Sequence, residues 1–292
     1  MTEPLRGKTV LVTGGTGGIG KQTARGLARL GARVLVVGRD PGRARKAVEE
    51  LRRDTGNDQV DSLTADVTHR RDLHHLADQV KDRHGTLDVL INNAGVTMAR
   101  RELTEDGVET AFAANVLAPY ILIHRLLPAL TRATPARVVN ITGGVPRGRI
   151  DLDNLQGERS YVGLSFYNQT KLALMAMSYT FAERLRGSGV NLNVAYPGHA
   201  YTSMNQSLTI DAYPPAARPI VPLLRLLMPV LYGQRALVKA SRSSIYLASS
   251  PHAADLHGTY INSKCQRTPW PTAVLDQRNR DAIWTLCEKL AS

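Results

Sequence analysis

The sequence predicts an α/β protein, a doubly wound parallel sheet of about seven strands that forms a single domain over residues 1–292. Short apolar runs rich in β-branched residues alternate with helix-forming segments from Thr9 onward, as in βαβ units. The first run ends in a glycine-rich turn that leads directly into a helix. With 292 residues, 43% of them hydrophobic, the chain is long enough to bury one large core.

Composition argues against several classes of partner and site. The net charge of +12 is carried mostly by arginines scattered over predicted helices, without a basic run interleaved with aromatics. We therefore expect solvated basic faces and one polyanionic cofactor, and no nucleic acid. Cys265 and Cys287 lack the spacing of a metal site, so a reducing compartment fits. The N-terminus contains no apolar segment of the kind found in signal peptides, and a cytoplasmic location is expected.

The first predicted βαβ unit carries a phosphate-binding signal. A strand over Thr9–Val12 is followed by a glycine turn at 13–20 and a helix over Lys21–Leu30. Glycines let backbone N–H groups approach a pyrophosphate, and the helix N-terminus adds partial positive charge. A purely structural glycine turn is the alternative. The residues expected to contact the cofactor are Gly14, Thr16, Gly18, Ile19 and Gly20.

The end of the second strand, Arg33–Val37, indicates which dinucleotide binds. A carboxylate for the adenine ribose usually stands there, but this chain has Gly38 and Arg39. A cation beside a residue without a side chain suits a 2′-phosphate, so the predicted cofactor is NADP(H). Asp40 precedes Pro41 and is expected to cap the next helix.

The remaining elements follow the same alternation. Helices are predicted over 44–54, 70–84, 104–130, 162–185, 234–249 and 276–290, and strands over 59–65, 87–91, 137–141, 191–195 and 259–262. The fourth strand ends in Asn92-Asn93-Ala94-Gly95. The paired amides can tie neighbouring strands together there. The small residues that follow let the backbone pass close to a flat ligand, so Asn93, Ala94 and Gly95 are expected to contact the cofactor.

Tyr167 and Lys171 form the candidate catalytic pair. They are four residues apart in a predicted helix and share one face of it. A neighbouring ammonium stabilises phenolate, so we expect the pKa of Tyr167 to lie below its reference value of about 10. This would make the phenol a general acid/base near neutral pH. An amphipathic surface pair is the alternative.

Four motifs together resemble the short-chain dehydrogenase/reductase family over essentially the whole chain. They are Thr-Gly-x-x-x-Gly-Ile-Gly at 13–20, Asp66-Val67, Asn92-Asn93-Ala94-Gly95 and Tyr167-x-x-x-Lys171. The stretches 148–155 and 258–261 resemble its retinol-dehydrogenase-like branch, although no N-terminal membrane anchor is expected here, unlike in many membrane-bound relatives. The resemblance implies a Rossmann-type fold and an NADP(H)-dependent oxidoreductase that interconverts a ketone or aldehyde and an alcohol.

The resemblance also implies roles for individual residues. Tyr167 and Lys171 would serve both catalysis and cofactor binding, and Asn115 would be the active-site asparagine whose carbonyl holds a water. Pro119 supports this role, because a proline four residues on cannot donate to that carbonyl. The further cofactor contacts implied by the family motifs are Asp66, Val67, Pro197, Gly198 and Thr202.

One catalytic position departs from the family. The substrate-orienting serine is expected three residues after Asn140, where this chain has Gly143. The neighbouring Thr142 carries a hydroxyl and is the candidate replacement, and a substrate bringing its own hydroxyl is another. The departure motivates a second class of function, a redox-silent relative that uses the nucleotide fold for cyclisation, dehydration, isomerisation or regulation.

The segment 203–234 is proline-rich and apolar. Its apolar part is too short to span a bilayer. We expect it to form a lid over a small lipophilic substrate, with a peripheral membrane contact as the second interpretation. No transmembrane segment is predicted, and the sequence leaves open whether the protein assembles into a homo-oligomer.

Overall fold

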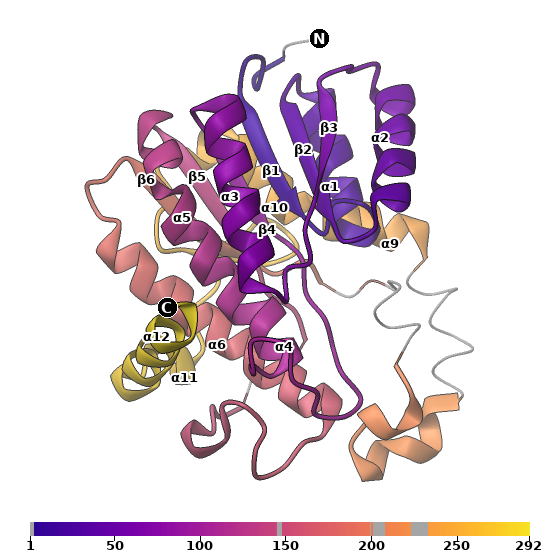
Figure 1. Ribbon diagram of the computed structural model, residues 1–292, viewed down its shortest axis with the longest axis vertical. Helices are drawn as coiled ribbons and strands as arrows, with labels where there is room; N and C mark the ends of the chain where they lie inside the picture. The colour runs from indigo at the N-terminus through magenta and orange to yellow at the C-terminus, as the bar shows by residue number, and fades with distance from the viewer. Residues whose placement is uncertain (1–2, 145–147, 199, 201–207, 223–232) are drawn as a thin grey trace.

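Seven parallel strands form one sheet in the order β3-β2-β1-β4-β5-β6-β7 (Figure 1). The computed structural model describes residues 3–144, 148–198, 200, 208–222 and 233–292. The strands are β1 (Thr9–Thr13), β2 (Arg33–Gly38), β3 (Val60–Thr64), β4 (Val89–Asn92), β5 (Ala136–Ile141), β6 (Val190–Ala195) and β7 (Tyr260–Ile261). The predicted fold class, strand number and parallel arrangement are confirmed.

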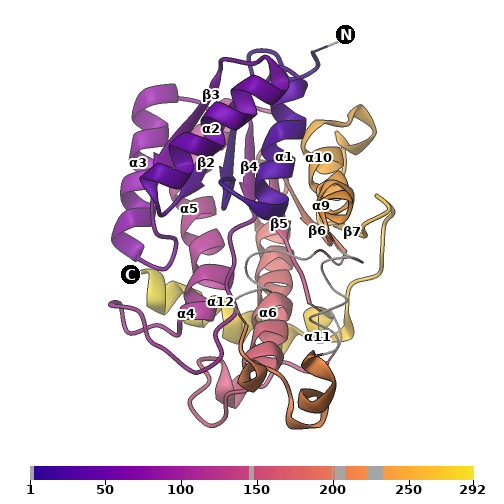
Figure 2. The ribbon, with the colours of Figure 1, turned by 90° about the vertical axis from the view of Figure 1, so that its right-hand side faces the viewer.

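Helices cover both faces of the sheet, as Figure 2 shows with α3 on one side and α1 and α10 on the other. One layer contains α1 (Gly18–Arg29), α2 (Pro41–Thr55) and α10 (Arg242–Ser249). The opposite layer contains α3 (Arg70–His84), α5 (Ala118–Arg132) and α6 (Gly163–Arg184). Because successive strand residues point to opposite faces, Leu11 packs in the second layer while Val10 and Val12 pack in the first.

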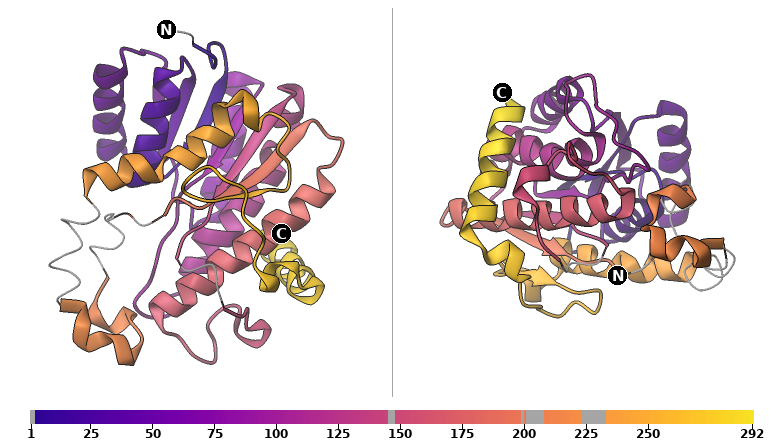
Figure 3. Two further views of the ribbon diagram at one scale, coloured as in Figure 1. Left: turned by 180° about the vertical axis from the view of Figure 1, so that it is seen from behind. Right: turned by 90° about the horizontal axis from the view of Figure 1, so that it is seen from below.

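Two predicted helices differ from the structure. The one predicted over 104–130 begins at Thr110 and consists of α4 (Thr110–Phe112), a π-helical turn η1 (Ala113–Leu117) and α5. Its start is set by the Glu109 side chain, which accepts a hydrogen bond from the N–H of Phe112 at 2.7 Å. The helix predicted over 234–249 is divided into α9 (Gln234–Ala240) and α10, which lie in front of the sheet in the left view of Figure 3. Ser241 lies at the break, where its hydroxyl donates to the carbonyl of Val238.

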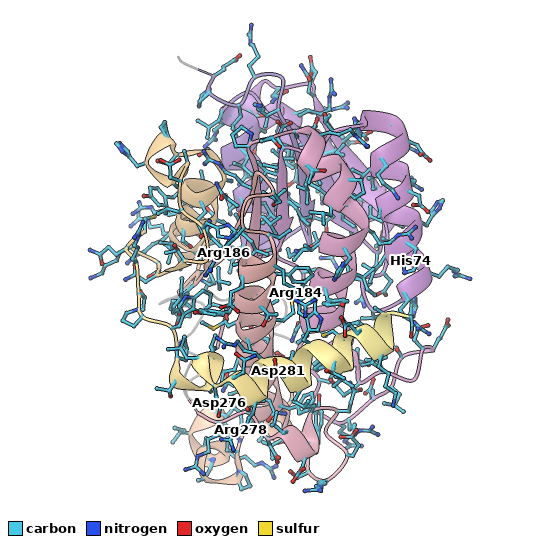
Figure 4. The ribbon with its side chains drawn as sticks, turned by 90° about the vertical axis from the view of Figure 1, so that its left-hand side faces the viewer. His74, Arg184, Arg186, Asp276, Arg278 and Asp281 are labelled. Carbon is cyan, nitrogen blue, oxygen red and sulfur yellow. The ribbon has the colours of Figure 1, made fainter. Side chains whose placement is uncertain are left out.

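The C-terminal helices close the second layer. The short α11 (Thr272–Leu275) leads into α12 (Gln277–Ala291), which crosses α6 (Figure 4). The ring of Trp284 lies 4.8 Å from that of Phe181, and the Arg184 guanidinium stacks on it at 3.8 Å. The contact therefore fixes α6 from the side away from the sheet.

One helical segment of the described chain, Thr110–Arg132, is long and apolar enough to pass a test for membrane spans. However, 78% of its tested window is buried inside the molecule. Packing against the sheet and α3 accounts for its apolar composition.

Candidate active site

A cleft of about 540 Å³ runs along the carboxyl ends of the strands. Arg39 and Arg43 line one end of it, and Leu164, Leu208 and Tyr213 contribute to its lining elsewhere. The chain crosses from one helical layer to the other between β1 and β4, because α1 follows β1 and α5 follows β4. Such a switch point is where open α/β sheets bind ligands.

Most of the residues predicted to form the site line this cleft. They are Gly14, Thr16, Gly18, Ile19, Arg39, Asp66, Val67, Asn93, Ala94, Gly95, Thr142, Tyr167, Lys171, Pro197 and Gly198. Asn115 and Gly20 lie behind the lining, and Thr202 lies outside the described residues. The described chain contains no cluster of three or more His, Cys, Asp or Glu side chains suited to a metal ion.

The glycine turn has the shape of a dinucleotide cradle. Gly14 adopts a left-handed φ of 64°, and a Cβ there would lie 2.9 Å from Nδ2 of Asn93. That amide donates to the Thr13 carbonyl at 2.9 Å, and the N–H of Ala94 donates to the Thr13 hydroxyl at 3.0 Å. The turn is thus braced against the end of β4. Since α1 begins at Gly18 beside the cleft, its N-terminus is available to a pyrophosphate.

The structure explains why no carboxylate stands at the end of β2. A Cβ at Gly38 would lie 2.6 Å from Cγ2 of Thr16, so a side chain at position 38 would displace Thr16 from the glycine turn. Asp40 is held by its cap, because its Oδ1 accepts from the N–H of Arg43 at 2.9 Å. This bond lowers the pKa of Asp40, and the predicted capping role is confirmed.

Sequence reasoning missed Arg43. Arg43 lines the cleft together with Arg39, and within the described chain neither forms an ion pair with a carboxylate. The signal was available, because the Asp40 cap and Pro41 place Arg43 in the first turn of a helix that begins beside the glycine turn. Two cations at this end suit a group with more than one negative charge.

Asn115 supports the site from behind. Its Oδ1 accepts from the N–H of Val96 at 2.9 Å, and its Nδ2 donates to the Val96 carbonyl at 3.0 Å and to the Thr170 hydroxyl at 2.8 Å. A Cβ at Gly95 would lie 2.8 Å from the same Oδ1. The amide is therefore fully engaged in holding the β4 loop against α6. Asn115 lies in the π-helical turn η1, a feature often found at functional sites.

Tyr167 and Lys171 are both buried, and Nζ of Lys171 lies 5.8 Å from the centre of the Tyr167 ring. Nζ donates to the carbonyl of Ile141 at 3.1 Å. Burial lowers the pKa of Lys171 to about 8 and raises the pKa of Tyr167 above its ordinary value. The expectation of a lowered phenol pKa was therefore wrong for this site. The two groups share a helix face, but loss of hydration outweighs the attraction of an ammonium at this distance.

Gly143 and Gly144 bring the backbone up to these side chains. A Cβ at Gly143 would lie 2.5 Å from the Tyr167 hydroxyl, and a Cβ at Gly144 would collide with Oδ1 of Asn168. Gly144 has a left-handed φ of 65°. The Thr142 hydroxyl is buried and has no hydrogen-bond partner within the described chain. A side chain at position 143 would have to share its space with the phenol.

The substrate end of the cleft was not predicted residue by residue. Leu164, Asn168, Leu208 and Tyr213 line it. Leu164 stands three residues before Tyr167 on α6, so helical periodicity could have found it. The predicted lid, 203–234, is described only over 208–222 and 233–234, and within that part Leu208 and Tyr213 reach the cleft. Its role as a lid stays a prediction.

The chain is similar to known proteins over nearly its whole length. The model of the short chain dehydrogenase family matches residues 8–212. Human retinol dehydrogenase 13 is 32% identical over 288 residues, which cover 98% of this chain and 85% of that protein. Bovine retinol dehydrogenase 12 is 33% identical over 289 residues, with 98% and 87% covered.

Solved structures agree with this assignment. A Mycobacterium paratuberculosis protein superimposes with a TM-score of 0.74 at 27% identity, covering 100% of this chain and 97% of its own. The Pseudomonas aeruginosa RhlG/NADP active-site complex has a TM-score of 0.67 at 28% identity, with 88% and 95% covered. Since the family model matches more than half of the sequence and near-full-length relatives exceed 30% identity, the chain belongs to the short chain dehydrogenase family and is an oxidoreductase.

Proposed function

We propose that this protein is an NADP(H)-dependent oxidoreductase that interconverts a small lipophilic ketone or aldehyde with the corresponding alcohol. One observation carries the proposal. A single cleft joins a glycine cradle and two arginines, which have no carboxylate partner within the described residues, to the buried pair Tyr167 and Lys171. Similar proteins support it, since one solved relative is a complex with NADP and the similar human protein is retinol dehydrogenase 13.

The glycine cradle would hold the pyrophosphate, and Arg39 and Arg43 would pair with a 2′-phosphate. Asp66, Val67, Ala94 and Gly95 line the stretch of cleft between the two ends. The bound cofactor supplies the hydride, and the chain supplies binding, orientation and the proton.

Tyr167 would donate its proton to the substrate oxygen. The raised pKa keeps the phenol protonated at neutral pH, which is the form that reduction requires. Lys171, held against the Ile141 carbonyl, would place a positive charge near the developing phenolate. Asn115 would position the β4 loop and, through its backbone carbonyl, a water next to Lys171.

The described side chains do not by themselves show which group, besides Tyr167, would donate a hydrogen bond to the substrate oxygen. The Thr142 hydroxyl remains the candidate that the sequence suggests, and it lies buried without a partner. The complete set of Tyr167, Lys171 and Asn115 disfavours a redox-silent role, which would not need it.

Steady-state oxidation of NADPH tests the proposal. We expect turnover with at least one member of a panel containing retinal, decanal and acetophenone, and weaker activity with NADH. Mass spectrometry of small molecules that co-purify would narrow the panel. A folded protein that binds NADPH but oxidises none of it with any carbonyl compound would contradict the proposed reaction.

Location and assembly stay predictions. A cytoplasmic protein is our proposal, supported by the basic composition and free cysteines. A peripheral contact with a membrane through 203–234 is the alternative. Cell fractionation separates the two, because only the second predicts recovery with membranes.

A further inference from the structure

We propose that the backbone N–H groups of Gly143 and Gly144 bind the substrate carbonyl oxygen together with the Tyr167 hydroxyl. They would supply the hydrogen-bond donors that Gly143 cannot offer from a side chain. This inference rests on the proposed reduction of a carbonyl compound. It adds the groups that stabilise the oxygen as negative charge develops on it.

The first observation is that both N–H groups lack an acceptor within the described residues. The last sheet-type bond of this strand runs from the N–H of Thr142 to the Ala195 carbonyl at 3.0 Å. Within the described residues, the N–H groups of Gly143 and Gly144, which follow Thr142, donate to no acceptor. Gly143 is buried, and buried N–H groups without an acceptor are rare in proteins. Both residues line the cleft, so a ligand is the natural source of the missing acceptor.

The second observation is where this backbone lies. The Tyr167 hydroxyl is 2.5 Å from the Cβ position of Gly143. An oxygen that takes the tyrosine proton lies about 2.7 Å from that hydroxyl, the usual O–H···O distance. The acceptor and the backbone at 143–144 therefore share one small region of the cleft.

The third observation is that a side chain at either position would displace a neighbouring side chain. The Tyr167 hydroxyl occupies the space at Gly143, and Oδ1 of Asn168 occupies it at Gly144. Gly144 also needs its left-handed φ of 65°. Successive N–H groups at a turn with a left-handed residue form concavities that bind anions. The glycine pair thus lets the backbone approach the phenol without a side chain between them.

Thr142 is the competing donor. Its main chain is held in the sheet by the bond to Ala195, and a β-branched side chain is stiff at χ1. Its hydroxyl would have to rotate toward the substrate, whereas the glycine N–H groups are fixed by the backbone. Donors that are already in place avoid that reorganisation in the transition state.

The step balances as follows. The carbonyl carbon accepts the hydride that NADPH supplies, and the electron pair of the C=O bond moves to the oxygen. The Gly143 and Gly144 N–H groups stabilise that oxygen through hydrogen bonds and transfer no proton. The proton comes from Tyr167, so the products are the alcohol and NADP⁺.

Replacing an amide by an ester tests a backbone donor without changing a side chain. Glycolate incorporated in place of Gly143, or in place of Gly144, removes one N–H and adds no Cβ. Glycolate in place of Gly187, an exposed turn residue outside the cleft, is the matched control. Thr142→Val removes the competing hydroxyl. The readouts are kcat and KM with NADPH and retinal, decanal or acetophenone, and the Kd for NADPH.

We expect each ester in the glycine pair to lower kcat about a hundredfold, as the loss of one oxyanion donor does. The Kd for NADPH and the activity of the Gly187 control should stay within about threefold of the unmodified protein, and Thr142→Val should lose less activity than either cleft ester. Full activity of both cleft esters would overturn this inference alone, as would a hundredfold loss confined to Thr142→Val. An unmodified protein that reduces no carbonyl compound would overturn the proposed function, and the inference with it.

Discussion

At the residue scale, the buried pair on α6 sets the chemistry. Tyr167 and Lys171 are both withdrawn from water, and loss of hydration disfavours the charged form of each. The phenol therefore stays protonated at neutral pH, and burial of the ammonium lowers the stability of the folded state. This loss of hydration leads to one prediction about activity, at Tyr167, and one about stability, at Lys171.

Tyr167→Phe removes the transferable proton while keeping the ring. We expect kcat for carbonyl reduction to fall by about 10²–10⁴, the usual contribution of a general acid. The Kd for NADPH and the melting temperature should change little. Tyr246→Phe, a half-buried tyrosine on α10 outside the cleft, is the control. Near-full activity of Tyr167→Phe would show that another group is the acid.

Lys171→Met exchanges a buried cation for an apolar side chain of similar length. The pKa of Lys171 falls from 10.5 to about 8 on folding. Below pH 8 the lysine is charged in both states, and its burial costs the folded state on the order of 3 kcal/mol. Between pH 8 and 10.5 the unfolded chain binds more protons, so this cost diminishes as pH rises.

Denaturant unfolding at several pH values measures this effect. At pH 7 we expect the methionine variant to be more stable by about 1–3 kcal/mol, less any loss of the hydrogen bond to Ile141. The advantage should shrink between pH 8 and 10 while reductase activity is lost throughout. Lys46→Met, at an exposed position, should show no such trend. A constant difference at all pH values would contradict the assigned cause.

Arg39 and Arg43 should decide the cofactor preference. Arg39→Ala and Arg43→Ala remove groups that can pair with a 2′-phosphate, and each should weaken NADPH binding by about tenfold. Binding of NADH should be nearly unchanged, because it lacks that phosphate. Arg45→Ala, on α2 but outside the cleft, is the control, and calorimetry is the measurement. Equal affinities of the unmodified protein for both cofactors would refute the assignment.

At the element scale, α6 is held from two sides. Its inner face packs on the sheet, and α12 covers its outer face through Trp284, which lies among Tyr120, Phe181 and Arg184. The start of α6 is also crowded, because a Cβ at Gly163 would collide with the carbonyl of Met98. Packing far from the cleft therefore contributes to the position of the catalytic helix.

Trp284→Ala should uncouple α12 from α6. Truncation of a buried tryptophan typically costs 3–5 kcal/mol, so we expect about that loss in the free energy of unfolding. Trp284 is 4% exposed, whereas Leu275 on α11 is 46% exposed. Leu275→Ala should therefore cost about 0.5 kcal/mol or less. Similar losses for the two variants would show that α12 adds little to the packing of α6.

At the scale of the whole molecule, one cleft connects both halves of the sheet. Arg39, which lines the cleft, follows strand β2, and Lys171, which also lines it, lies on α6. A ligand that spans them stabilises the native state as a unit. At one hundred times its Kd, NADPH should stabilise the fold by about 2.7 kcal/mol and raise the melting temperature by about 5 °C.

Differential scanning calorimetry checks this expectation. We expect a single transition that moves upward with NADPH more than with NADH at equal concentration. The Arg39→Ala/Arg43→Ala double variant should reduce the NADPH shift to that of NADH. Two transitions that respond separately to NADPH would contradict a single cooperative unit.

Local signals in the sequence were sufficient for the fold. The strand β1 and the turn at Gly14 were predictable because β-branched runs and glycines act within a few residues. The Asp40 cap and the shared helix face of Tyr167 and Lys171 follow from the same short-range geometry. By itself, the sequence thus determined the parallel α/β sheet, the cradle and the candidate acid.

The tertiary structure decided what depends on distant elements. The pKa of Tyr167 rises because elements from other parts of the chain exclude water from it. Arg43 joins Arg39 because α2 starts beside the glycine turn. Within the described residues the N–H groups of Gly143 and Gly144 have no acceptor, because the neighbouring strands β4 and β6 end at Asn92 and Ala195. The burial of a group and its hydrogen-bond partners depend on residues that are close to it in space. Residues that are adjacent in sequence do not determine them.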